Sequence, residues 1–168
     1  TTAFNAITGA RQHIANYPGV TVEKKYGTVH HQGCEIEVVD LPGTYSLTAY
    51  SMEEIVARDF VINEKPRLVV DIVDASNLDR HLYLAVQFKE LGVPLILALN
   101  MVDVAESRGI KVDHHKLSAQ FGVPVVPMVA RTGKGITDLL DKVVEEAVKN
   151  PEWVNAPMSY GIDIDSGL

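Results

Sequence analysis

Apolar residues follow two different spacings along the chain. Near-continuous apolar runs fill 68–74, 94–99 and 124–128, and each has the length of a strand buried on both faces. Apolar residues at helical spacing occupy five other stretches, namely 1–9, 51–64, 78–91, 113–121 and 135–149. Strands that alternate with helices in this way predict an α/β fold, a doubly wound and mostly parallel sheet with helices on both faces.

The segment between the first helix and residue 40 departs from this alternation. Residues 10–27 have weak periodicity and contain a Pro18-Gly19 turn, so we expect a long mobile loop there. The stretches 24–31 and 34–39 are predicted as two strands joined around Gln32-Gly33.

Length, charge and cysteine content limit the class of protein. The 168 residues suffice for one domain, which we place at 1–149, and residues 150–168 are expected to be a linker or the start of a following helical domain. A net charge of −7 leaves no basic stripe for phosphates, so we expect no nucleic-acid partner. Cys34 opens a predicted strand and is expected to be a small core residue.

A candidate phosphate and metal site follows the strand at 34–39. The string Asp40-Leu41-Pro42-Gly43 places a carboxylate at the end of a strand, where it can lie close to a metal. Its glycine can offer a backbone N–H to a phosphate, because no Cβ blocks the approach. The string alone indicates little. Thr21, in the predicted loop, can close its hydroxyl onto Mg²⁺, but it is equally an ordinary β-branched residue entering a strand.

A candidate base-recognition site follows the strand at 94–99. In Asn100-Met101-Val102-Asp103, the Asn side chain can bond the O6/N7 edge of guanine and the Asp can accept from N1–H and N2–H. The alternative is that Asn100 and Asp103 are helix caps. In Val129-Ala130-Arg131, a small residue lets a backbone N–H approach the base oxygen, unless this is an ordinary strand-to-helix loop.

The order of these motifs is far more specific than any one of them. Together with the strings at 16–23, 40–47 and 73–78, they make residues 1–149 resemble the GTP-binding domain of the bacterial ferrous iron transporter family FeoB. Met101, which stands where most small GTPases have Lys, also fits this family. The fold of such a domain is the doubly wound sheet of P-loop GTPases.

The resemblance implies a role for each motif. Thr1, Thr21 and Asp40 are expected to hold Mg²⁺, Asp40 either directly or through water, and Thr21 and Gly43 to take part in catalysis. The nucleotide-binding residues that it implies are Thr1, Thr2, Gly19, Val20, Thr21, Val22, Glu23, Asp40, Leu41, Pro42, Gly43, Asn100, Met101, Val102, Asp103, Val129, Ala130 and Arg131. The implied cofactors are GTP or GDP and Mg²⁺.

The phosphate-binding loop of such domains is not in the sequence. The Gly-x-x-x-x-Gly-Lys that should precede Thr1, and the central strand before it, are both missing. We favour the interpretation that the sequence is a fragment of a longer chain that contains this loop. The alternative is that the chain lacks it and binds nucleotide poorly. Some family members bind K⁺ through an Asn of this loop, so K⁺ remains an additional candidate cofactor.

Activity and partners follow from the same resemblance. Thr44 stands where many GTPases have the Gln that orients the attacking water, so we expect a GTPase with slow hydrolysis. The implied partners are the helical and transmembrane domains of the same transporter, at the cytoplasmic face of the bacterial inner membrane. A second copy of the chain, in a homo-oligomer, is a further candidate partner. Two rival functions are a soluble GTPase of the TrmE or Era type and a non-hydrolysing interaction module.

The histidines raise the question of iron binding. No His-x-x-Glu or His-x₃-His spacing occurs, and adjacent histidines point in different directions. We therefore expect solvated surface histidines and no direct iron binding. The histidines concerned are His13, His30, His31, His81, His114 and His115.

Overall fold

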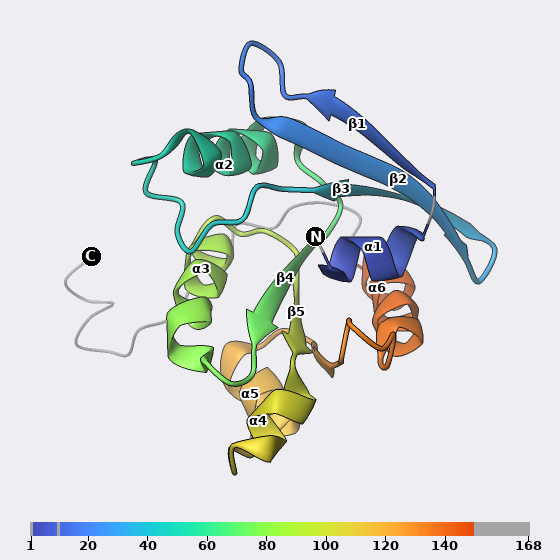
Figure 1. Cartoon of the computed structure of the whole chain (residues 1–168), viewed down its shortest axis with the longest axis vertical. Helices are drawn as coiled ribbons and strands as arrows, with labels where there is room; N and C mark the ends of the chain where they lie inside the picture. Colours follow the sequence, from blue (N-terminus) through green and yellow to red (C-terminus); the bar gives the residue numbers. More distant parts are fainter. Residues whose placement is uncertain (1, 10, 150–168) are drawn as a thin grey trace.

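The computed structural model describes residues 2–9 and 11–149. Strands β1, β2 and β3 form an antiparallel sheet in that order, and strands β4, β5 and β6 form a parallel sheet (Figure 1). The elements are α1 (Thr2–Thr8), β1 (Gln12–Asn16), β2 (Glu23–His31), β3 (Cys34–Asp40), α2 (Met52–Glu64), β4 (Val69–Asp74), α3 (Leu78–Glu90), β5 (Leu95–Asn100), α4 (Val102–Ser107), α5 (His114–Phe121), β6 (Val125–Pro127) and α6 (Ile136–Lys149).

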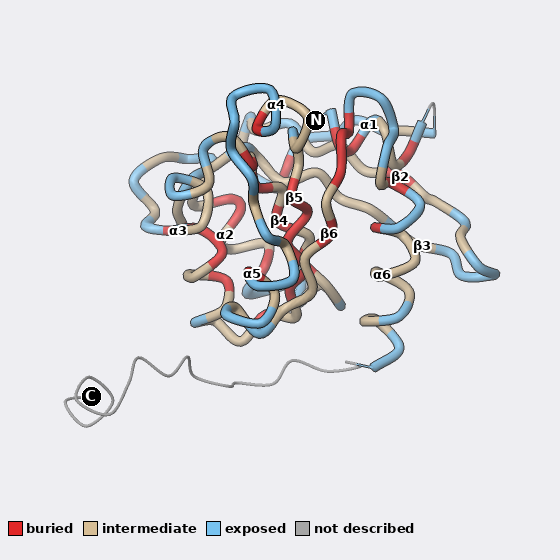
Figure 2. Tube along the Cα trace, turned by 90° about the horizontal axis from the view of Figure 1, so that it is seen from below, coloured by how far each residue is buried: buried red, intermediate tan, exposed pale blue. Residues whose placement is uncertain are grey.

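The parallel sheet is covered on both faces, as the apolar runs predict. Alternate residues of β5 enter different cores: Leu97 packs in a cluster with Val61 of α2 and Phe88 of α3. Ala98 packs in a second cluster with Leu139 of α6 and with residues of α1. The buried colour in Figure 2 accordingly runs through β4 and β5 in the middle of the molecule. The predicted α/β fold with helices on both faces is confirmed.

The antiparallel sheet is partly as predicted. The strands on either side of Gln32-Gly33 form a hairpin, β2 and β3. The loop predicted over 10–27 is wrong at Gln12–Asn16, which form β1 and pair with β2. Four of the five β1 residues are exposed, so this edge strand shows no apolar alternation. Backbone hydrogen bonds to β2 hold β1 in place, and a pattern of side chains in the sequence cannot predict them.

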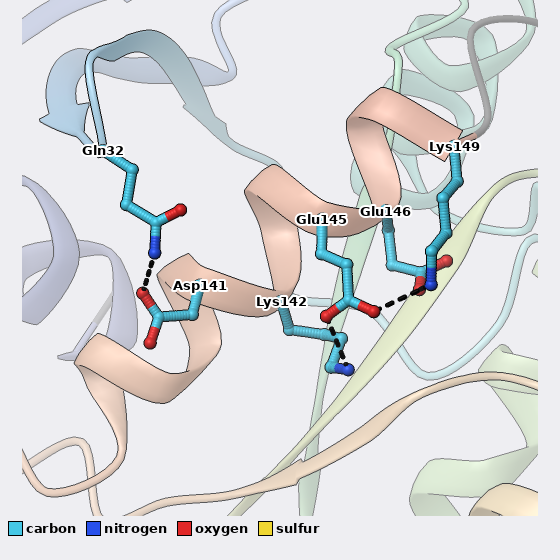
Figure 3. A network of polar contacts seen from close by, with 6 residues as sticks. All are labelled: Gln32, Asp141, Lys142, Glu145, Glu146 and Lys149. Atoms are coloured by element: carbon cyan, nitrogen blue, oxygen red, sulfur yellow. Dashed lines mark hydrogen bonds and ion pairs between the residues drawn. The ribbon is translucent and has the colours of Figure 1, made fainter.

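The turn of the hairpin is attached to α6. The Asp141 carboxylate accepts a hydrogen bond from Gln32 Nε2 at 2.7 Å (Figure 3) and lies 2.6 Å from His31 Nε2. The His31 side chain is only 18% exposed, so the expectation of a solvated histidine is wrong there. Cys34 is exposed, so its predicted place in the core is also wrong.

The same helix carries a line of exposed charges. Glu145 accepts hydrogen bonds from Lys142 and Lys149, and these bonds, that of Lys149 first, lower the pKa of Glu145 to about 2 (Figure 3). Exposed pairs of this kind contribute little to stability, because water solvates both partners and screens their attraction. The apolar face of α6, rather than these charges, holds it on the sheet.

One buried carboxyl lies on the outer strand of the parallel sheet. Asp71 is 7% exposed, and its Oδ2 has no hydrogen-bond partner among the described residues. In the described part of the chain β4 pairs only with β5, and β3 only with β2. Burial raises the pKa of Asp71 to about 7, because the carboxylate loses its solvation.

Because its pKa is raised in the folded state, Asp71 should make the protein less stable as pH rises. Between its ordinary pKa of 3.8 and about 7, the folded state binds more protons than the unfolded state. The free energy of unfolding should therefore fall as pH rises through this window, by up to about 1.4 kcal/mol per pH unit, and this loss is complete above pH 7. Urea unfolding of wild type and Asp71→Asn from pH 4 to 8 measures it, with exposed Asp138→Asn as the control. Parallel curves for wild type and Asp71→Asn would refute the assignment.

Candidate functional site

The first part of the site is a small pocket where β2 meets the end of β3. It has a volume of about 160 Å³ and is lined by Glu23 and Lys25 of β2 together with residues 40–43. Lys25 is the direct cross-strand partner of Asp40. The structure thus brings together Glu23 and Asp40-Leu41-Pro42-Gly43, which the sequence separates by 17 positions or more. Lys25 is a pocket residue that the sequence reasoning missed, since a lysine in a strand resembles any exposed charge.

The loop before β2 closes on itself. The Tyr17 N–H donates to the Val22 carbonyl at 2.9 Å, and the Val20 N–H donates to the Tyr17 carbonyl at 3.3 Å. Gly19 has a φ of +75°, a conformation that costs glycine least, which explains the Pro-Gly turn. Thr21 is exposed on this loop and is not among the residues that line the pocket.

The segment after Gly43 is organised around Glu54 of α2. The Glu54 carboxylate accepts from the Ser46 and Thr48 hydroxyls and from the Tyr50 N–H at 2.9 Å. The pKa of Glu54 is lowered, chiefly by the bond from the Tyr50 N–H. The Thr44 hydroxyl donates to the Ser46 carbonyl at 2.6 Å, so it is engaged within its own loop.

The second part of the site joins the loops after β5 and β6. Asn100 Oδ1 accepts from the Ala130 N–H at 3.0 Å, and Asp103 Oδ2 accepts from Arg131 Nη2 at 3.0 Å. The cap at the start of α4 is Met101, with a φ of +60° and no side-chain cap bond. The alternative that Asn100 and Asp103 are helix caps is therefore wrong. Helix α4 itself was not predicted, because six residues give too little periodicity.

The loop at 129–131 is held by burial and by a backbone hydrogen bond. Val129 and Ala130 are buried, and the Val129 N–H donates to the Lys134 carbonyl at 2.8 Å. Gly135 has a φ of +85°, and a Cβ there would lie 2.5 Å from the Pro127 carbonyl oxygen, so only glycine fits. The exposed Arg131 side chain is thus presented by a rigid turn, whereas its ion pair with Asp103 is open to water.

Three predicted site residues remain to be placed. Thr1 is outside the described residues, and Thr2 is the exposed first residue of α1. Val102 begins α4 beside Asp103. The cluster at 23–43 belongs to the antiparallel sheet, and the cluster at 100–131 belongs to the parallel one.

Cavity size and metal-ligand grouping add little to these assignments. A larger cavity of about 470 Å³ lies between the loop after β4 and α5, and no predicted site residue lines it. Within residues 2–9 and 11–149 there is no group of three or more His, Cys, Asp or Glu placed to hold a metal ion. In the same part of the chain, no helix combines the length and the apolar character needed to cross a bilayer.

Comparison with known proteins finds relatives that are much longer than this chain. The family model described as ferrous iron transport protein B matches residues 1–143. The chain is 48% identical over 145 residues to a Porphyromonas gingivalis Fe(2+) transport protein A/Fe(2+) transporter FeoB fusion protein, covering 86% of this chain and 17% of that protein. It is 46% identical over 143 residues to the Escherichia coli K12 Fe(2+) transporter FeoB, covering 83% and 18%. The chain therefore spans less than a fifth of these curated relatives.

Solved structures give the same result. The cytosolic domain of the T. maritima FeoB iron transporter in its GMPPNP form is 40% identical with a TM-score of 0.90, covering 98% of this chain and 65% of that one. The FeoB G-domain from Methanococcus jannaschii is 51% identical with a TM-score of 0.76, covering 88% of each chain. With the family model, the relatives and the folds in agreement, this chain belongs to the ferrous iron transport protein B family, as part of its N-terminal G domain.

Proposed function

We propose that this chain is a guanine-nucleotide switch: it binds GTP and GDP with Mg²⁺, hydrolyses GTP slowly and changes loop conformation with the nucleotide. The observation that carries the proposal is a pair of hydrogen bonds: the Ala130 N–H donates to Asn100, and Arg131 donates to Asp103. Two motifs about 30 residues apart are held side by side, as one base-binding surface requires. Solved relatives in GDP and GMPPNP forms support the choice of ligand.

The base surface explains how guanine is selected. Asp103 is 38% exposed and is paired with an exposed arginine, so its carboxylate can exchange Arg131 for the N1–H and N2–H of the base. Adenine lacks this donor pair and would leave the carboxylate without a partner. Asn100 accepts from the Ala130 N–H and so holds the loop at 129–131 in place. Burial of Val129 and Ala130 fixes the position of that loop relative to the sheet.

The phosphate surface has the chemistry that a nucleotide with Mg²⁺ needs. Asp40 and the hydroxyls of Thr1 and Thr21 are oxygen ligands, the kind that Mg²⁺ prefers. When bound, the ion neutralises phosphate charge. Lys25, beside Asp40, adds positive charge to the same pocket, and Gly43 offers an unhindered N–H. The residues at 19–23 complete this surface, with Thr21 and Gly43 as catalytic residues. The engaged Thr44 hydroxyl is poorly placed to orient water, which accords with slow hydrolysis.

The setting of the domain is part of the same proposal. Residues 1–149 act as the G domain, and 150–168 lead into a helical domain of a ferrous iron transporter at the cytoplasmic face of the inner membrane. The chain matches less than a fifth of the length of these relatives, which supports the proposal that it is part of a larger protein. The family match disfavours a soluble TrmE- or Era-type GTPase, and a module that binds without hydrolysis is the second candidate.

Binding of fluorescent GDP to the intact protein, with ATP as competitor, tests the proposal. We expect tight binding that excess GTP abolishes and excess ATP leaves unchanged. Single-turnover phosphate release then separates a GTPase from a non-hydrolysing module. Competition by ATP at equal strength would overturn the assignment of the base surface.

Asp103→Asn should change the base that is bound. The amide keeps one oxygen but gains an NH₂ donor, which suits the C2 carbonyl of xanthine and opposes the guanine NH₂. We expect GTP affinity to fall by about tenfold to a hundredfold and xanthosine triphosphate to bind more tightly than GTP. Competition titrations measure both, with Asp79→Asn on α3 as the control. Unchanged GTP affinity would place the base elsewhere.

Thr21→Ala should separate the two nucleotides. A hydroxyl that closes onto Mg²⁺ only with a γ-phosphate contributes to GTP binding and not to GDP binding. We expect the affinity for a non-hydrolysable GTP analogue to fall by about tenfold, and that for GDP to stay within about twofold. Calorimetric titrations of both in Mg²⁺ measure this, and exposed Thr137→Ala on α6 is the control. An equal loss for both nucleotides would contradict the role.

A further inference from the structure

Tyr17 is the one residue of the loop at 17–22 that is buried. Its relative exposure is 6%, whereas Asn16, Pro18 and Gly19 beside it are all exposed. Its backbone closes the loop at both ends, since the Tyr17 N–H bonds the Val22 carbonyl and the Tyr17 carbonyl accepts from Val20. A tyrosine in this position anchors the segment at 17–22, which carries Thr21.

The side chain of Tyr17 reaches two other elements. Its hydroxyl donates to the backbone carbonyl of Asp40 at 3.2 Å, at the start of the segment 40–43. Its ring meets Phe60 of α2 edge-on, with centroids 6.0 Å apart and planes at 80°. Edge-to-face pairs of this kind favour one orientation of the two rings.

The side chain of Lys24 lies over the rings of three aromatic residues. Its ammonium lies 5.9 Å from the Tyr17 ring centroid and 5.6 Å from those of Tyr26 and Phe60. Cation–π attraction therefore adds to burial in holding the ring. Burial, with the charge of Asp40, raises the pKa of Tyr17 to about 12, so the hydroxyl remains a proton donor throughout the physiological range.

We propose that Tyr17 is a positioning residue that couples the loop at 17–22 to the segment at 40–43, so that the two move together. The proposal rests on the proposed function for its consequence: Thr21 and Gly43 would approach the γ-phosphate as one unit. The residues at 17–22, 40–43 and α2 otherwise come from separate stretches of chain, and Tyr17 contacts all three through its backbone, hydroxyl and ring. Tyr17 touches neither base nor reacting atoms in this role.

Amide hydrogen exchange of the full-length protein without nucleotide tests the coupling itself. Tyr17→Phe removes only the hydroxyl, so protection of the amides at 19–22 and of those of Leu41 and Gly43 should fall together by about threefold to tenfold. Protection of β5 at 95–100 should not change, and Tyr83→Phe, an exposed tyrosine of α3, should change neither loop. Increased exchange in only one loop, in neither, or equally throughout the protein would overturn the proposal.

A second readout links the coupling to the nucleotide. In Tyr17→Phe the ratio of affinities for a non-hydrolysable GTP analogue and GDP should fall by about threefold to tenfold, whereas the midpoint of thermal unfolding should stay close to wild type. A ratio equal to that of wild type would overturn the γ-phosphate role. If wild type binds no guanine nucleotide, the proposed function fails, and hydrogen exchange alone decides whether Tyr17 couples the loops.

Discussion

The burial of β5 on both faces is the constraint on which the rest of the parallel sheet depends. Leu97 faces the core formed with α2 and α3, and Ile96 and Ala98 face the core formed with α1 and α6. A strand buried on both sides cannot slip by one residue without exchanging its two faces, so its register is strongly specified. That register places Asn100 where β5 ends, opposite Asp74 of β4.

The loops that follow β5 and β6 are joined to each other by two side-chain hydrogen bonds. Asn100 crosses from the end of β5 to the Ala130 N–H, and thereby joins two loops that meet only because their strands are neighbours. The Asp103–Arg131 pair beside it is exposed, so it contributes little to stability and is free to exchange partners. This combination of a tightly packed strand and an exposed, exchangeable ion pair is what the proposed base-binding surface requires.

The antiparallel sheet is held in a different way. β1 lies at its edge and is largely exposed, and the hairpin of β2 and β3 is attached to α6 through Asp141. Tyr17 and Glu54 gather the loops on either side of Asp40 by hydrogen bonds to backbone groups and hydroxyls. Segments held mainly by such bonds open more readily than a packed core. We therefore expect this part of the domain to open more readily than the parallel sheet.

The sequence by itself determined the α/β fold, nearly all of the helices and buried strands, and the family, because apolar periodicity and motif order are local properties of the chain. It did not predict β1 or α4, since an exposed edge strand and a six-residue helix carry almost no periodic signal. It also could not decide between a helix cap and a base reader at Asn100. Only the tertiary structure excluded the cap, since Met101 holds that position and Asn100 accepts from the Ala130 N–H, and it alone revealed Lys25 in the pocket and the contact of Tyr17 with Asp40. These are contacts between residues distant in the chain, and only the folded backbone brings them together.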